Sequence, residues 1–283
     1  MKLMPLPKRV LQCGAHRLDL SQPQIMGILN VTPDSFSDGG KHNHKDQAIA
    51  HALQMIADGA SVIDVGGEST RPGALVVEVE EEIRRVVPVV EALAQYNVII
   101  SIDTSQPEVM RAAVQAGAHI WNDVRALTKP QALATAAALN IPVIIMHMRG
   151  EPTTMNQLNQ YEEVTRDVMR ELQQRIQAAL EAGIKSDHIM IDPGFGFAKN
   201  AQQNLKLLQE FHVLNDLGYP ILSALSRKRF IGEVLAEVDA PQRAIGSVAA
   251  HLLSIQQGAC MVRVHDVKAT SDAIKVWQAM SQA

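Results

Sequence analysis

Short runs of Val, Ile, Leu and Met recur along the chain, and each run stops at residues able to bind a ligand or take part in a reaction. The eight runs end at Asn30, Asp64, Asp103, Asn122 with Asp123, His147, Asp192, Ser226 to Lys228, and Arg263 with His265. Apolar residues at helical spacing follow the runs, as at Val79, Ile83, Val86 and Val90. Strands that alternate with helices and end on polar residues are typical of a (β/α)8 barrel. We therefore predict the α/β class and a TIM barrel whose site lies at the carboxyl ends of its strands.

One barrel accounts for nearly all of the 283 residues, because eight βα units typically occupy roughly 250 residues. We predict a single barrel domain over residues 25–283. Residues 1–24 form an amino-terminal extension in this interpretation, and a small hairpin is one arrangement open to them. The predicted helices cover residues 45–58, 79–93, 107–116, 130–139, 160–182, 201–216, 241–257 and 267–281, with a short extra helix over 228–238.

Two predicted connections are long and rich in Gly, Pro, Ser and Thr. They cover residues 31–44 after the first barrel strand and 66–77 after the second. Most βα loops have about two to six residues, and longer ones are often functional. Because both loops leave carboxyl ends of strands, we interpret them as lids over the site.

Composition narrows the functional class. Hydrophobic residues make up 47% of the chain and aromatic residues only 4%, which suits a barrel core of branched aliphatic side chains. The net charge is −4 with acids and bases interspersed, so we expect no nucleic-acid partner. Cys13 and Cys260 are far apart and fit no metal spacing. No signal peptide or apolar membrane segment is evident, so we predict a reduced, cytoplasmic protein without a membrane partner.

The polar strand ends suggest recognition of a nitrogen heterocycle. Asp103, Asn122 and Asp192 end three central strands, and carboxylates with an amide match the edge of an amino-substituted ring. Capping or loop support is the alternative for each residue taken singly. Five further residues could bind a phosphorylated group and stabilise a departing oxyanion: Asn30, Arg71, Lys228, Arg263 and His265. We interpret His147 as a hydrogen-bonded core histidine and Arg227 as a solvated surface charge.

Longer motifs connect these residues to a known family. Residues 26–40 (MGILNVTPDSFSDGG) and 66–73 (GGESTRPG) are similar to the signatures of dihydropteroate synthases of the pterin-binding family. Shorter matches occur at residues 101–104, 122–123, 146–148, 192–197, 226–228 and 263–266. The resemblance extends from about residue 18 to residue 280. Trp121, Arg149 and Arg229 depart from the usual pattern, and their roles are left open.

The resemblance implies condensation of 6-hydroxymethyl-7,8-dihydropterin pyrophosphate with p-aminobenzoate to 7,8-dihydropteroate and pyrophosphate. The implied pterin-binding residues are Asp103, Asn122, Met146, Asp192, Phe197, Lys228 and Arg263. Those implied for p-aminobenzoate are Phe36, Thr70, Pro72 and Ser226, again with Lys228. Those implied for pyrophosphate are Asn30, Arg71, Arg263 and His265, with Asn30 also a ligand of Mg²⁺. Lys228, Arg263, His265 and Arg71 would be the catalytic group. A homodimer and inhibition by sulfonamides are also implied.

The implied mechanism is dissociative: Mg²⁺ and cations disperse charge on the leaving pyrophosphate, and the pterin stabilises a methylene cation that the amine attacks. The main alternative is a pterin-binding methyltransferase acting on methyltetrahydrofolate. An aldolase that uses Lys228 as a Schiff-base nucleophile and a non-catalytic pterin-binding protein are further alternatives. Binding of pyrophosphate, borohydride trapping and turnover would separate them.

Overall fold

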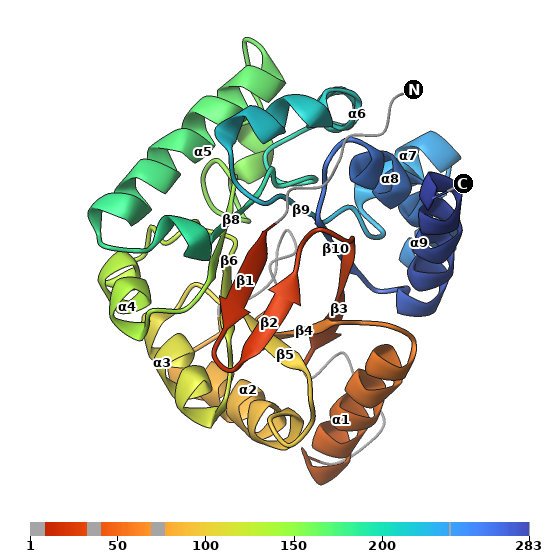
Figure 1. Cartoon of the computed structure of the whole chain (residues 1–283). Coiled ribbons are helices and arrows are strands. Elements are labelled where there is room, and N and C mark those ends of the chain that lie inside the picture. The colour runs from red at the N-terminus through yellow and green to blue at the C-terminus, as the bar shows by residue number, and fades with distance from the viewer. Residues whose placement is uncertain (1–8, 33–40, 69–76, 238, 283) are drawn as a thin grey trace.

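The computed structural model describes residues 9–32, 41–68, 77–237 and 239–282, and its main feature is a parallel sheet rolled into a barrel (Figure 1). Eight strands lie in the order β8-β7-β6-β5-β4-β3-β10-β9. Their bounds are β3 (Gln24–Asn30), β4 (Val62–Gly66), β5 (Ile99–Asp103), β6 (Ile120–Asp123), β7 (Val143–Met146), β8 (Ile189–Asp192), β9 (Leu222–Ser223) and β10 (Met261–Val264). A parallel bridge between Ile191 and Ile221 joins the two ends of the sheet. The predicted (β/α)8 barrel is confirmed.

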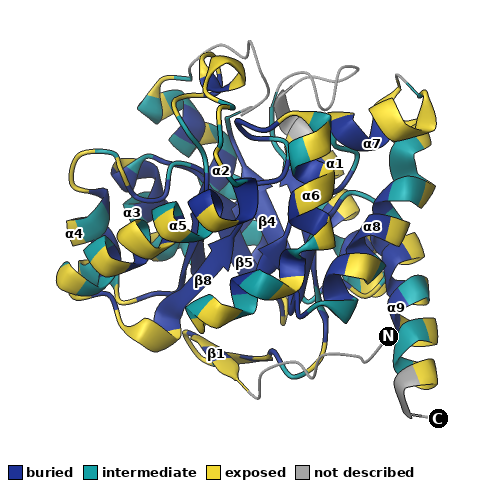
Figure 2. Ribbon diagram, turned by 90° about the horizontal axis from the view of Figure 1, so that it is seen from above, coloured by how far each residue is buried: buried dark blue, intermediate teal, exposed yellow. Residues whose placement is uncertain are grey.

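Helices surround the barrel and cover the outer face of its sheet (Figure 1). They are α1 (Lys41–Ala57), α2 (Val79–Leu93), α3 (Pro107–Ala116), α4 (Ala132–Leu139), α5 (Val164–Glu181), α6 (Ala201–Gln209), α7 (Arg229–Leu235), α8 (Ala244–Gln256) and α9 (Val267–Gln282). Each helix has a buried, apolar face turned to the sheet and an exposed face turned to solvent (Figure 2). No helix in the described ranges is long and apolar enough to cross a membrane.

The prediction of one helix over residues 201–216 was wrong. The α-helix α6 ends at Gln209, and Phe211–Leu217 form a 3-10 helix instead. Phe211 is fully buried and its ring lies parallel to that of Phe195, with centroids 6.1 Å apart. The change of helix type places this ring in the core, and large aromatic side chains contribute strongly to core packing.

Two other predicted boundaries also needed correction. The helix expected over 160–182 begins only at Val164, because the Glu163 side chain caps it by accepting a hydrogen bond from the Arg166 backbone N–H. The helix expected over 241–257 begins as a 3-10 turn, Ala240–Arg243, which contains Pro241 and leads directly into α8.

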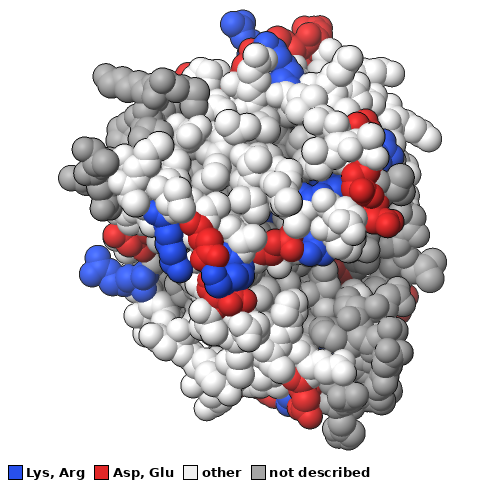
Figure 3. Space-filling view, turned by 90° about the vertical axis from the view of Figure 1, so that its right-hand side faces the viewer, with Lys and Arg blue, Asp and Glu red and all other residues white. Residues whose placement is uncertain are grey.

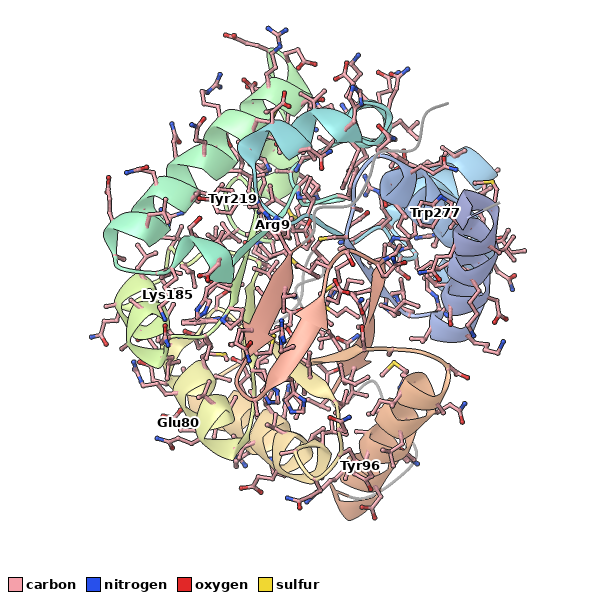
Figure 4. All side chains as sticks on the ribbon, in the orientation of Figure 1. Arg9, Glu80, Tyr96, Lys185, Tyr219 and Trp277 are labelled. Carbon is pink, nitrogen blue, oxygen red and sulfur yellow. The ribbon has the colours of Figure 1, made fainter. Side chains whose placement is uncertain are left out.

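A hairpin closes the amino end of the barrel. Strands β1 (Val10–Cys13) and β2 (His16–Asp19) pair antiparallel and lie across the barrel mouth in Figure 1. Their apolar side chains share one buried cluster with barrel-interior residues, and side chains fill the space behind the hairpin (Figure 4). The cluster contains Leu11, Cys13, Leu18, Leu20, Met26, Val62, Ile99, Ile120, Ile144, Met190, Leu222, Cys260 and Met261. Cys13 and Cys260 are buried free thiols, and burial raises the pKa of each to about 12.

The barrel interior changes from apolar to polar toward the carboxyl ends of the strands. Side chains alternate between the two faces of a strand, so Asp64 points to the same side as Val62 of the apolar cluster. By the same alternation, Ser101 points to the same side as Ile99, and Arg263 points to the same side as Met261. Asp64 and Ser101 are register partners on neighbouring strands, and Arg263 bonds to Asp64 across the barrel interior, so these polar residues share one level of the barrel. This level forms the floor of the candidate site.

Candidate active site

A buried polar cluster joins four strands at the barrel axis. Asp64 is fully buried on β4, and its Oδ2 accepts a 3.0 Å hydrogen bond from Asn122 Nδ2 of β6. Arg263 of β10 donates from Nε to the same oxygen over 2.6 Å, and from Nη2 to Asp103 Oδ2 over 2.7 Å. Three of the predicted site residues, Asp103, Asn122 and Arg263, are therefore in one connected network.

The network carries more negative charge than its single arginine can neutralise. Burial raises the pKa of Asp103, and the Arg263 charge only partly opposes this effect. Burial alone would lower the pKa of Arg263, but Asp64 and Asp103 outweigh it and keep the guanidinium charged. Asp64 Oδ1 and Asp103 Oδ1 have no hydrogen-bond partner among the described residues. Buried polar atoms normally have partners, so these oxygens are suited to accept hydrogen bonds from a ligand.

Asp192 lies beside this network at the end of β8. Its Oδ1 accepts a 2.7 Å hydrogen bond from the Gly194 N–H, within the loop 192–197. Gly194 has φ of +69°, and a Cβ there would lie 1.9 Å from the His147 carbonyl oxygen. Only glycine allows the loop to approach so closely. Burial raises the pKa of Asp192, while the Gly194 hydrogen bond and the charge of Lys228 lower it.

Phe197 and Lys228 meet over the loop 192–197. The Lys228 Nζ lies 4.1 Å from the centre of the Phe197 ring, within the range of a cation–π contact. Phe197 also belongs to a small buried cluster with Met146 and Met155. The predicted apolar residues Met146 and Phe197 thus lie together, next to the predicted cation Lys228.

Ser226 and His265 form a second pair at the rim. Ser226 Oγ lies 3.0 Å from His265 Nδ1, and it also accepts a 3.1 Å hydrogen bond from the His265 backbone N–H. The interpretation of Arg227 as a solvated charge was wrong. Its guanidinium makes a two-point ion pair with Asp266, with distances of 2.6 and 3.0 Å, because Arg227 lies next to the strand end that carries this carboxylate.

The two predicted lid loops are only partly described. Asn30 ends β3 beside Gly66, and its Oδ1 lies 3.6 Å from the point where a Gly66 Cβ would stand. Phe36, Thr70, Arg71 and Pro72 lie outside the described residues. No group of three or more His, Cys, Asp or Glu side chains is placed to hold a metal ion within the described ranges.

Sequence reasoning missed Asp64 and Glu82. Asp64 was recognised as a strand end but received no role, although it alternates in phase with Asp103 and could have been assigned to the same polar layer. Glu82 of α2 is fully buried, and neither of its side-chain oxygens has a hydrogen-bond partner among the described residues. It packs so closely against Gly67 that a Cβ there would lie 2.8 Å from Glu82 Cγ. Helical spacing from Val86 and Val89 places Glu82 on the buried face of α2, and this signal could have found it.

Glu82 should make stability depend on pH. Burial raises its pKa to about 7, and the nearby carboxylates of Glu68 and Asp103 add to this effect while the Arg125 charge opposes it. The folded protein therefore binds this proton more tightly than the unfolded chain. The contribution of Glu82 protonation to the stability of the fold is largest below pH 4.5 and is lost as pH rises through about 7. Compared with the wild type, Glu82→Gln should gain more stability at pH 8 than at pH 5. We expect this difference in the free energy of unfolding to be on the order of 2 kcal/mol.

Urea unfolding at the two pH values measures this effect. The control is Glu80→Gln, because Glu80 is exposed on the same helix (Figure 4). Parallel pH profiles for the wild type and Glu82→Gln would contradict the assignment.

Comparisons with known proteins show the family to which the chain belongs. The family described as pterin binding enzyme matches residues 26–265. A dihydropteroate synthase of Haemophilus influenzae is 51% identical over 267 residues, covering 94% of this chain and 97% of the relative. The chain belongs to the dihydropteroate synthase family. It is therefore an enzyme, and the family is one of transferases.

Solved structures of the family have the same fold. A Xanthomonas albilineans dihydropteroate synthase with 4-aminobenzoic acid has a TM-score of 0.93 and 51% identity, covering 98% of this chain and 100% of that one. A second structure from that organism, in complex with 7,8-dihydropteroate, has a TM-score of 0.89 and 49% identity, covering 97% and 99%. The methyltransferase, aldolase and non-catalytic alternatives lose their support, because these relatives share nearly the full length of the chain.

The three departures from the family pattern have structural explanations. Trp121 is fully buried, and its Nε1 donates a 2.8 Å hydrogen bond to the Thr104 carbonyl. Arg149 pairs with Glu171 and lies 3.9 Å from the centre of the Tyr161 ring. Arg229 is 79% exposed in its side chain and pairs with Glu233 on the same helix. None of the three belongs to the polar network at the barrel axis.

Proposed function

We propose that this barrel mouth condenses 6-hydroxymethyl-7,8-dihydropterin pyrophosphate with p-aminobenzoate, forming 7,8-dihydropteroate and pyrophosphate. The observation that supports this most is the buried network of Asp64, Asp103, Asn122 and Arg263, with two carboxylate oxygens open to a ligand. Incubation with both substrates and Mg²⁺, followed by detection of dihydropteroate, tests the proposal. Release of pyrophosphate without dihydropteroate would indicate hydrolysis instead.

The pterin would lie against the axial network. An amino-substituted pyrimidine ring presents N–H donors, which suit Asp103 Oδ1 and the Asp192 carboxylate. Asn122 supplies an amide that is held in place by its bond to Asp64. Phe197 and Met146 offer apolar surface to the ring, and Lys228 stands over the Phe197 face. Because these groups come from different strands and loops, the site can read both the edge and the faces of the ring.

The pyrophosphate and p-aminobenzoate would lie nearer the rim. His265 is held by Ser226, and Arg263 has Nη1 beyond the two nitrogens committed to Asp64 and Asp103. Both could contact the leaving group, together with Arg71. Ser226 and Lys228 would border p-aminobenzoate, with Phe36, Thr70 and Pro72 supplied by the lid loops. Sulfonamides would compete at this position, because they resemble p-aminobenzoate.

Asn30 fits a magnesium site that also includes the substrate. Mg²⁺ prefers oxygen ligands and is often held by one or two protein groups together with substrate phosphates. The Asn30 amide oxygen, near the open Asp103 carboxylate, is suited to this role. Bound there, Mg²⁺ would supply Lewis-acid stabilisation of the pyrophosphate.

The reaction should be dissociative. Cationic groups surround the leaving pyrophosphate in this proposal. None of the residues assigned to the site acts as a base for p-aminobenzoate, because its amine attacks as a neutral aniline. We expect the single-turnover rate at saturating amine to change less than about threefold per pKa unit across ring-substituted p-aminobenzoates, because the slow step precedes attack. A steep dependence on amine basicity would indicate direct displacement.

A homodimer through α8 and α9 is a further part of the proposal. Four apolar side chains on these helices are strongly exposed: Ile245 (86%), Leu253 (47%), Val276 (71%) and Met280 (56%). On the side of the molecule that carries α7 to α9, wide areas of the surface formed by described residues show no Lys, Arg, Asp or Glu side chains (Figure 3). Sedimentation of the wild type and of Val276→Glu measures the association. The buried free thiols Cys13 and Cys260 support a reduced, cytoplasmic location.

A further inference from the structure

A buried lysine lies directly behind the loop 192–197, called the pterin loop below because it carries Asp192 and Phe197 of the proposed pterin site. Lys199 is 8% exposed and stands between the loop 192–197 and α6. None of the roles assigned above uses it. An uncompensated buried ammonium costs several kcal/mol, so its partners should explain why it is there.

The partners of Lys199 match the three N–H groups of an ammonium. Its Nζ lies 3.0 Å from the Gly194 carbonyl, 3.1 Å from the Phe197 carbonyl and 2.9 Å from His147 Nδ1. An ammonium has three donors and no acceptor, so His147 Nδ1 must accept. The remaining ring nitrogen, Nε2, then carries the proton and donates to Glu171 Oε2 over 2.9 Å. Burial lowers the pKa of His147 to about 4, in agreement with a neutral ring.

Two of these bonds hold the pterin loop by its backbone. The Gly194 carbonyl accepts from both Lys199 and the Phe197 N–H. At one end of the loop the Gly194 N–H binds Asp192, and at the other the Phe197 ring faces Lys228. Losing the Lys199 ammonium would leave two buried carbonyls with fewer donors and release both pterin-binding residues from their positions.

We propose that Lys199 is a positioning residue for the pterin, whose ammonium holds the loop 192–197 in its binding shape and connects it through His147 to Glu171. This inference rests on the proposed function, since it assigns Asp192 and Phe197 to the pterin. Lys199 itself does not touch the reacting atoms.

The hydrogen-bonded chain from Lys199 through His147 to Glu171 leads from the buried loop to solvent. Glu171 of α5 is 27% exposed in its side chain and pairs with Arg149. His147 and Glu171 both line a cavity of about 400 Å³ between α5 and the loops after β6 and β7. A proton can therefore be exchanged between Lys199 and water along His147 and Glu171 without opening the pterin site.

Pterin binding should weaken as this lysine loses its proton. Burial lowers the pKa of Lys199 to about 7, against the charges of Asp192 and Glu171, while Lys228 and Arg149 lower it further. The ammonium donates all three bonds, whereas the neutral amine has only two N–H donors, so the binding shape is favoured below about pH 7 and weakened above it. By linkage, bound pterin raises the pKa of Lys199 in return.

Calorimetry with 6-hydroxymethyl-7,8-dihydropterin pyrophosphate tests this in Lys199→Met, which keeps an unbranched apolar side chain close to the lysine stem but has no donors. We expect the wild-type Kd to rise roughly tenfold from pH 6 to pH 8.5, and the variant to bind about tenfold more weakly at pH 6 and to show no such rise. The KM for p-aminobenzoate should stay within about twofold of the wild type. The control is Lys206→Met, because Lys206 is 46% exposed on α6.

Glu171→Gln provides a second variant that leaves the loop bonds intact. Removing this negative charge lowers the pKa of Lys199, so the rise in Kd should move to lower pH. A pH profile retained in Lys199→Met, or a Glu171→Gln profile that coincides with the wild type, would overturn the inference. If the wild type itself neither binds this pterin nor forms dihydropteroate, the proposed function fails instead.

Discussion

Replacing Asp192 by Asn should weaken pterin binding by roughly ten- to hundredfold and leave the barrel folded. A hydrogen bond to a charged group contributes about 1.5–3 kcal/mol, which corresponds to that range of affinity. Asp192 also holds the loop 192–197 through the Gly194 N–H, and an amide oxygen can still accept this bond. The substitution therefore removes charge while keeping the shape of the loop.

Calorimetry with the pterin pyrophosphate measures the loss, and thermal unfolding checks the fold. Asp187→Asn is a matched control, because Asp187 is exposed just before the opposite end of the same strand. An Asp192→Asn protein that binds the pterin like the wild type would remove Asp192 from the site.

Replacing Arg263 by Met should destabilise the fold and abolish activity. The guanidinium is the ion-pair partner of both Asp64 and Asp103, so its loss leaves two buried carboxylates without a counter-charge. Breaking a buried ion pair in this way costs about 3–5 kcal/mol. In the variant, the folded state favours protonated carboxyls, so stability should recover as pH falls from 8 to 5.

Urea unfolding at both pH values follows this recovery. Arg229→Met is the matched control, since its exposed pair with Glu233 should contribute only about 0–1 kcal/mol. A loss in Arg263→Met that is equal at the two pH values would mean that packing, rather than the unpaired carboxylates, accounts for it.

Periodicity and strand endings predicted the barrel because each βα unit carries its own local signal. Apolar runs of strand length and helical spacing are both visible in short windows. The exact ends of elements were less predictable. The break after Gln209 depends on where the Phe211 ring packs, and that position is set by Phe195, which is nearby only in the folded protein.

Part of the site was predictable for the same local reason. Asp103, Asn122 and Asp192 end apolar runs, and parallel strands bring their ends to one rim. Asp64 and Glu82 were not assigned, although strand alternation for Asp64 and helical spacing for Glu82 place both on inward faces. Lys199 was missed too, since its partners Gly194, Phe197 and His147 matter only once the loop is folded.

The sequence by itself thus determined the order of strands and helices and which residues stand at the strand ends, because these follow from local spacing. Only the tertiary structure decided how the charges are shared. Arg263 lies 199 residues from Asp64 and 160 from Asp103 along the chain, yet pairs with both. Barrel closure brings β10 next to β3 and aligns the polar level of its interior. Burial at that level then decides which carboxylates stay charged and which oxygens remain open to a ligand.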